Sequence, residues 1–443
     1  MTLREVADVV GGVAHGEATV TGGAFLDLRA AEHGGFLVAL EGEHVDGHDV
    51  ARAAGTAGAV AVLGSRPTAL PTVVVDDVTE ALGRLARHVL DRLPDAVVLA
   101  MTGHGTTGPL DHLAHALSAN GPTIATPGGL HDELGVSLTV LRATPETRYL
   151  VLAMAARGVG QLARLCSIAP PHVAAVLDVG TARVGELLEA LGPGDVAVLD
   201  ADDDLARAVA ARTRATVTTF GGPGADVAVH EVTTDEIGRQ SFELAHRGSF
   251  ATVHLAQVGS SRWRDAVPAA AMALAAGLDL DAVADALSDA VPASRRRMEP
   301  GERADGLVVL DDAHDADPES VRAALDTLAG IGARSGRRTV AVLGEVLEPG
   351  DGAAEAHRAL GAYAAEVGVD LLVTVGPAAG AVAEGHSGAG ARGVTIPTAG
   401  RDAAVEWLRH NVSAADVVLV TASRGAALDV IADELLEEGN SNR

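Results

Sequence analysis

The sequence contains no lysine, so every Lys-or-Arg residue in its charge count is an arginine. A chain without lysine has no ammonium group for a phosphate loop, no amine for a Schiff base and no side chain to carbamylate. A GC-rich genome explains much of this absence, because alanine, glycine, valine and aspartate are also abundant. The absence nevertheless argues against ordinary phosphate-loop ATP chemistry.

Aromatic residues, positive charge and cysteine are also scarce. Aromatics make up 2% of the chain, which is low for a protein that stacks nucleobases. The formal net charge of -27 repels nucleic acid and anionic membranes, so we expect neither as a partner. The single cysteine, Cys166, lies in an apolar stretch and is predicted to be a buried core residue in a reducing compartment. The N-terminus lacks an apolar signal core and no run approaches ~18 uncharged apolar residues, so we expect a cytoplasmic protein.

The chain of 443 residues, 48% hydrophobic, is long enough for two to four domains. We place an N-terminal α/β domain at residues 1–93, because Pro94 and Asp95 are breakers that follow it. Its predicted elements are a helix over 2–10, strands near Phe36–Leu40 and Val60–Leu63, and a helix over Val78–Leu93.

Two further domains are predicted from buried strands that alternate with helices. Residues 94–293 predict a parallel, doubly wound central sheet that ends in a helical stretch over Ala266–Leu287, and residues 294–443 predict a Rossmann-like sheet. The predicted central strands are Val97–Met101, Tyr149–Met154, Val173–Leu177 and Val196–Leu199. The predicted C-terminal strands are Leu307–Leu310, Thr339–Leu343, Leu371–Val375 and Val417–Thr421.

A glycine-rich turn follows the strand that ends at Met101. It contains Gly103, Gly105, Thr106 and Thr107 and leads directly into a helix, an arrangement that suits an anion. A working phosphate loop ends in Gly-Lys-Thr or Gly-Lys-Ser, and here Thr106 stands at the lysine position while the hydroxyl position, Thr107, is kept. A purely structural strand-to-helix turn is the alternative. His104 in this turn could act as an acid or a base, although the sequence reveals no partner for it.

The order of short segments along nearly the whole chain resembles a Mur ligase of the MurF type, which adds D-Ala-D-Ala to UDP-MurNAc-tripeptide. The matching segments are Phe36–Gly42, Asp46–Asp49, Thr126–Leu130, Leu134–Thr139, Ala155–Gly158, Ile168–Pro171, Leu199–Asp203, Ser294–Glu299, Asp312–Ser320, Ala341–Glu345 and Ser423–Gly425. The resemblance implies an α/β, three-domain architecture with a central P-loop-type parallel sheet and a Rossmann-like C-terminal domain.

Such a ligase transfers the γ-phosphoryl group of ATP to a carboxylate, and an amine then attacks the acyl phosphate. This sequence departs from the family at positions that serve the phosphates, the metal ions and the nucleotide. Asp178 replaces an asparagine, and a segment that holds the family's carbamylated lysine is missing after Gly185. The positions that match the family's ATP and metal sites are Gly103, Gly105, Thr106 for lysine, Thr107, Ala153 for glutamate, Arg183 for histidine, Asp315 and Asp317 for asparagines, and Thr421 for lysine.

Other polar residues of the family pattern are kept. Asp27 and Arg29 match a segment that touches the UDP-sugar in the family, although its serines are Leu26 and Leu28 here. The residues predicted to retain ligand binding are Asp27, Arg29, His48, Arg297 and Arg424. The acidic loop Asp311–Asp317 could bind a metal, or its aspartates could cap the next helix.

The losses together favour a pseudoenzyme that needs no cofactor and acts as a binding, scaffold or regulatory partner. Its partner would be an active Mur-type ligase or another enzyme of a cell-wall or specialised-metabolite pathway, and its ligand a nucleotide sugar or a peptide. The alternative is an active ATP-dependent acid–amino acid ligase with a rearranged site, using ATP and Mg²⁺. Under this alternative the first groups to test are His104, Thr106, Thr107, Asp202 and Arg424. An ATP-independent enzyme is a third hypothesis, with no motif to support it.

Overall fold

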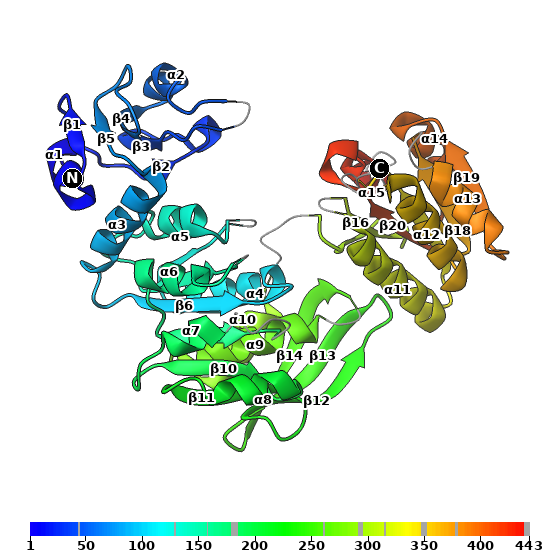
Figure 1. Cartoon of the computed structure of the whole chain (residues 1–443). Helices are drawn as coiled ribbons and strands as arrows, with labels where there is room; N and C mark the ends of the chain where they lie inside the picture. The colour runs from blue at the N-terminus through cyan, green and yellow to red at the C-terminus, as the bar shows by residue number, and fades with distance from the viewer. Residues whose placement is uncertain are drawn as a thin grey trace. The chain divides into compact units, whose positions relative to one another are not determined.

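The fold contains three separate β-sheets (Figure 1). The structure is a computed structural model that describes residues 1–42, 45–127, 130–156, 158–178, 185–259, 262–290, 296–313, 316–346, 352–376 and 380–437. The chain divides into two compact units, the first comprising Met1–Val229, Leu244–Ala251 and Asp265–Ala286, and the second His230–Glu243, Thr252–Arg264 and Leu287–Arg443. Within the described residues, no helix is long and apolar enough to cross a membrane.

The N-terminal sheet has five strands in the order β1-β5-β4-β3-β2. A capping box between Thr2 and Glu5 starts its first helix, which ends at Gly11 with φ +74°. The buried side chains of Phe36, Leu63 and Leu82 contribute to the core beneath the sheet. The elements are α1 (Leu3–Val10), β1 (Val13–His15), β2 (Ala24–Phe25), β3 (Gly35–Val38), α2 (Ala51–Thr56), β4 (Ala59–Gly64), β5 (Thr72–Val74) and α3 (Val78–Leu90).

The central sheet has nine strands in the order β14-β13-β12-β11-β10-β9-β6-β8-β7. Its strands from β7 to β11 pair in parallel, which confirms the predicted doubly wound arrangement. The elements are β6 (Val97–Thr102), α4 (Thr107–Ser118), β7 (Thr123–Ala125), α5 (Glu133–Val140), β8 (Tyr149–Ala153), α6 (Gln161–Ile168), β9 (Val173–Val176), α7 (Gly185–Glu189), β10 (Val196–Asp200), α8 (Asp204–Ala210) and β11 (Thr216–Gly221).

The second half of the central sheet differs from the sequence prediction. Three long strands, β12 (Val227–Thr234), β13 (Arg239–His246) and β14 (Ser249–Val258), continue it. Strand β12 pairs in parallel with β11, and short turns join β12 to β13 and β13 to β14, as in hairpins. The helical stretch predicted over Ala266–Leu287 is confirmed, but it is not continuous. It is two helices, α9 (Trp263–Ala275) and α10 (Leu280–Ser288), separated at Gly277, whose φ of +93° lies in the left-handed region.

The C-terminal sheet has six strands in the order β15-β16-β20-β17-β18-β19, and strand residues alternate between two cores. Helices α11 and α12 cover one face, and α14 and α15 cover the other, as a Rossmann-like sheet requires. The elements are β15 (Glu299–Glu302), β16 (Val308–Asp312), α11 (Pro318–Ser335), β17 (Arg338–Leu343), α12 (Ala353–Glu366), β18 (Leu371–Val375), α13 (Gly380–Gly388), β19 (Val394–Thr398), α14 (Arg401–Asn411), β20 (Asp416–Thr421) and α15 (Asp429–Glu437).

Helices α12 and α13 approach each other backbone to backbone at two glycines. A Cβ on Gly361 would overlap the carbonyl oxygen of Val382, and a Cβ on Gly385 would overlap that of Arg358. Any side chain at either position would therefore force the two helices apart.

We predict that Gly385→Ala lowers the free energy of unfolding of the second unit by about 3 kcal/mol, because backbone must move to admit a methyl group. Gly388→Ala on the same helix is the matched control, since a Cβ there meets nothing within 4 Å. Urea unfolding followed by tryptophan fluorescence measures the difference, because both tryptophans, Trp263 and Trp407, lie in the second unit. Equal unfolding midpoints for the two variants would contradict this packing.

Strand β16 ends in two neighbouring carboxyl groups that are largely buried. Desolvation raises the pKa of both Asp311 and Asp312 to about 6. The carboxylate of Asp312 accepts hydrogen bonds from the Met298 N–H at 3.0 Å and from the Thr421 hydroxyl at 3.2 Å. The charges of Arg262 and Arg297 lower its pKa only in part.

We predict that Asp312→Asn makes the protein relatively more stable as pH rises. The unfolded carboxyl has a pKa near ~3.9, so between roughly pH 4 and 6 the unfolded chain ionises more readily and wild-type stability falls. Asparagine can accept from the Met298 N–H through its oxygen and donate to the Thr421 hydroxyl oxygen through its NH₂ group. It never ionises, so its advantage over wild type should grow by about 2 kcal/mol between pH 4.5 and 8. Urea midpoints at the two pH values measure it.

Asp305→Asn is the opposite control. A hydrogen bond from Arg303 lowers the pKa of Asp305 to about 2, so ionised Asp305 stabilises the fold at pH 8 and its removal should cost stability there. A stability difference between Asp312→Asn and wild type that does not change with pH would show that Asp312 stays ionised.

Candidate active site

Strands β6 and β9 are parallel neighbours, paired from Leu99 with Val173 to Thr102 with Val176. The chain crosses to β7 and β8 on one side of β6 and to β9 and β10 on the other. Ligands of open α/β sheets bind at such a switch point, beyond the carboxyl ends of the strands. The glycine turn that follows β6 lies there, beside the segment that follows β9.

Two glycines shape this turn. Gly103 has φ +122° and Gly105 has φ +68°, conformations that favour glycine. A Cβ on Gly103 would lie 2.9 Å from the backbone nitrogen of Asp178, whereas a Cβ on Gly105 would meet nothing within 4 Å. Gly103 therefore fits the turn against the chain after β9, while the backbone at Gly105 faces open space.

The first turn of α4 has no side-chain cap. Thr106 precedes the helix and Thr107 begins it, and neither hydroxyl makes a hydrogen bond with the described part of the chain. The first N–H groups of a helix carry partial positive charge and need acceptors. This end of α4 can therefore receive an anion, although Thr106 brings no positive charge.

His104 has a partner that the sequence did not reveal. Its Nδ1 lies 2.7 Å from Oδ2 of Asp178, which is 74 residues away along the chain. The two residues meet because one follows β6 and the other follows β9, so strand order was the signal needed to predict the pair. The imidazole is 89% exposed and the Asp178 side chain 46% exposed.

A second carboxylate lies against the start of α4. A Cβ on Gly108 would be 2.7 Å from Oδ2 of Asp265, a residue of α9. The turn thus has acidic side chains on two sides, Asp178 and Asp265. A phosphate bound there needs compensating positive charge, since like charges repel.

The described positions among the others predicted for metal ions and for the nucleotide belong to β8, to the start of α11 and to β20. Ala153 is buried at the end of β8 and offers no oxygen ligand from its side chain. Asp317 caps α11 by accepting hydrogen bonds from the N–H groups of Glu319 and Ser320, as expected for a capping aspartate. Thr421 donates a hydrogen bond to Asp312. Arg183, Asp315 and the side chain of Arg424 lie outside the described residues.

The residues predicted to contact a nucleotide sugar are engaged within the protein. Asp27 caps a short turn and is bonded by the guanidinium of Arg29, with Nε to Oδ2 at 2.8 Å, which lowers the pKa of Asp27 to about 2. Arg297 lies near Asp312, whose pKa its charge lowers. Cys166 is buried, and desolvation raises the pKa of its thiol to about 12, which agrees with the predicted core role.

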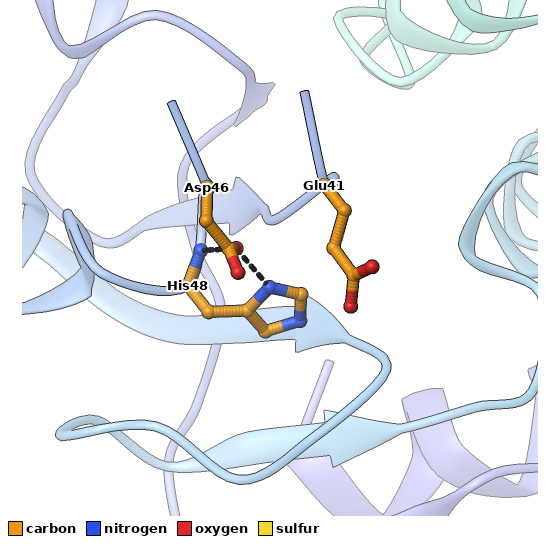
Figure 2. Close-up of side chains that lie close together, drawn as sticks. All are labelled: Glu41, Asp46 and His48. Carbon is orange, nitrogen blue, oxygen red and sulfur yellow. Dashed lines mark hydrogen bonds and ion pairs between the residues drawn. The ribbon is translucent and has the colours of Figure 1, made fainter. Parts of the chain in front are cut away.

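His48 belongs to a cluster with Glu41 and Asp46 whose ligand atoms all lie within 4.8 Å of one another (Figure 2). The Nδ1 of His48 donates to Asp46 at 2.6 Å, and its Nε2 accepts from the Ser65 N–H at 2.9 Å. Both nitrogens of this buried ring are therefore occupied, so it has no lone pair to give to a metal.

Arg66 supplies the positive charge of this cluster. Its guanidinium lies 2.8 Å from Asp46 and 3.7 Å from Glu41. Hydrogen bonds from the backbone and ring of His48, and then from Arg66, hold the pKa of Asp46 well below its usual range. The cluster is a closed network that anchors the loop at Asp46 and His48, and its geometry does not fit a metal site.

Comparisons with known proteins identify relatives over the whole length. Residues 102–273 match the Mur ligase middle domain, and residues 296–424 match the Mur ligase glutamate ligase domain. The UDP-N-acetylmuramoyl-tripeptide–D-alanyl-D-alanine ligase of Mycobacterium tuberculosis H37Rv is 37% identical over 99% of this chain and 98% of its own length. The Escherichia coli K12 ligase of the same name is 29% identical over 99% of both chains.

Solved structures agree with these relatives. A crystal structure of MurF from Acinetobacter baumannii superposes with a TM-score of 0.83 at 26% identity, covering 98% of each chain. MurF ligase from Thermotoga maritima in complex with ADP gives a TM-score of 0.74 at 25% identity, over 95% of this chain and 98% of that one.

These similarities contradict the expectation of a pseudoenzyme. Full-length relatives up to 37% identical are named as ligases, and their names support peptidoglycan synthesis but not specialised metabolism. The expectation went wrong because it counted the family's own positions, whereas charge around a phosphate can come from other positions or from a metal ion bound to the nucleotide. The similarity along the whole chain and the shared three-sheet fold show that this protein belongs to the Mur ligase family, in its MurF branch.

Proposed function

We propose that the protein is an ATP-dependent ligase that joins a UDP-N-acetylmuramoyl peptide to D-alanyl-D-alanine. The observation that carries this proposal is similarity over 99% of the chain to ligases of that name. The relative from Thermotoga maritima, solved with ADP, supports ATP as the energy source. The departures at Thr106, Ala153 and Thr421 then describe a rearranged site.

The reaction proceeds in two steps. An oxygen of the donor's terminal carboxylate attacks the γ-phosphorus of ATP, so that an acyl phosphate forms and ADP leaves. The amino group of D-alanyl-D-alanine then attacks the acyl carbon, phosphate leaves, and the amine gives up a proton. Both steps depend on positioning and on positive charge around transferring phosphoryl oxygens.

The turn after β6 supports the part of this proposal that concerns binding of the ATP phosphates. It combines an uncapped helix start at Thr106, open space over Gly105 and a hydroxyl at Thr107 that makes no hydrogen bond with the described residues. ATP would enter as its magnesium complex, and the ion supplies positive charge that the chain lacks at position 106. Ala153 does not fit the metal role of the family residue at that position, so we assign no step to a second ion there.

A cavity of about 360 Å³ at the end of β8 supports a site for the peptide part of the donor. Ala155 and Ala156 in its lining directly follow β8, which pairs with β6. The rest of the lining combines polar and apolar groups, as peptide binding requires, from Thr79, His131, Asp132, Glu133, Leu134, Gln161 and Leu165.

We predict ADP formation that requires UDP-N-acetylmuramoyl-tripeptide, D-alanyl-D-alanine and Mg²⁺ together, with a matching amount of ligated product by mass spectrometry. Thr107→Val should lower kcat/KM on the order of 10- to 100-fold, because it removes the hydroxyl at the start of α4. Ser118→Ala is the control, since Ser118 lies at the other end of α4 and bonds only its own helix, at the Ala114 carbonyl. Neither ADP nor product above the blank at any pH from 6 to 9 would overturn the proposed function.

A further inference from the structure

The chain contains no lysine, and the turn that would hold the nucleotide phosphates has Asp178 and Asp265 beside it. Adding phosphate charge to two carboxylates is unfavourable unless a cation lies within a few ångströms. His104 is the basic side chain that the sequence places on the turn itself, between Gly103 and Gly105. The contacts of the His104 ring therefore determine whether it can donate a hydrogen bond to a bound anion.

The contact with Asp178 fixes the role of each ring nitrogen. A carboxylate only accepts, so Nδ1 of His104 carries the proton of the 2.7 Å hydrogen bond. The other nitrogen, Nε2, lies across the ring and makes no hydrogen bond with the described residues. When Nε2 is also protonated, the ring is a cation with a donor left for a ligand.

The backbone holds the pair in place. Gly103 packs against the Asp178 nitrogen, and the Leu177 N–H donates to the carbonyl of Thr102 at 3.0 Å. His104 is therefore fixed at the base of its side chain, and Asp178 limits the rotation of the ring. The ring is 89% exposed, so a ligand can reach it from solvent.

We infer that His104, positioned by Asp178, supplies the cationic donor to the nucleotide phosphates that a lysine at position 106 would supply. This inference rests on the proposed function, because it assigns a residue to the same ATP site. A histidine in this role makes nucleotide affinity depend on pH in the range where imidazole titrates, whereas a lysine would not. Among the described residues, Asp178 lies against the His104 ring and Asp265 lies against the start of α4.

The test is calorimetric titration of the full chain with Mg-ADP at pH 6 and pH 8.5. Wild type should bind at least about 5-fold more tightly at pH 6, and His104→Gln should bind about 10-fold more weakly than wild type at pH 6 but equally at pH 8.5. Because phosphate also titrates in this range, the ratio of wild type to variant at each pH is the readout. His15→Gln, at an exposed position on β1, is the control and should match wild type.

A second substitution separates charge from folding. Thr106→Lys added to His104→Gln should restore binding and remove the pH dependence, because the ammonium stays charged at both pH values.

The outcomes distinguish this inference from the proposed function. If wild type takes up no Mg-ADP at either pH, nucleotide use itself fails and so does the proposed function. If wild type binds while His104→Gln binds equally well at pH 6, the ligase proposal stands and the role of His104 is overturned.

Discussion

The parallel pairing of β6 with β9 is the constraint on which the candidate site depends. It aligns Thr102 with Val176, so the turn after one strand and the segment after the other leave the sheet side by side. Gly103 admits the backbone of Asp178 at a distance that no side chain would allow, and the His104–Asp178 contact follows. A shift of one residue in this register would turn strand side chains to the opposite face and separate the pair.

Two histidine–aspartate pairs show how burial determines what the same chemistry can do. His48 is buried, and Ser65 occupies the nitrogen that Asp46 leaves, so the ring ties a loop together. His104 is exposed, and the nitrogen that Asp178 leaves makes no hydrogen bond with the described residues. Asp312 represents a third case, because desolvation raises its pKa to about 6 although the charges of Arg262 and Arg297 lower it in part. In this chain of net charge -27, a carboxyl group is therefore paired with a histidine or has a raised pKa, depending on how deeply it is buried.

Buried strand runs were enough to predict the parallel strands β6, β8, β9 and β10 of the central sheet and four strands of the C-terminal sheet. Strands β13 and β14 were missed because their burial largely alternates with exposure, and β12 because it is buried only over its first three residues. The break between α9 and α10 depends on the backbone of Gly277, and a glycine inside an apolar helical pattern is compatible with either outcome. The glycine turn and Thr107 could be predicted, whereas the partners Asp178 and Asp265 required the strand order and the packing of α9 on α4.

The expectation of lost activity rested on the residue types at the positions of the family's motifs, and it left out charges from other sources. Thr106 in place of lysine is a real change in charge, but the free energy of phosphate binding depends on the summed field at the site. A proton on His104 or an ion that arrives with the nucleotide enters that sum without matching any family motif. The relevant comparison is therefore the total charge within a few ångströms of the turn, which includes Asp178 and Asp265 as well as His104. A rearranged ligase site and an inactive one differ in this sum, and comparing nucleotide binding between wild type and a variant that lacks the imidazole isolates the contribution of the histidine.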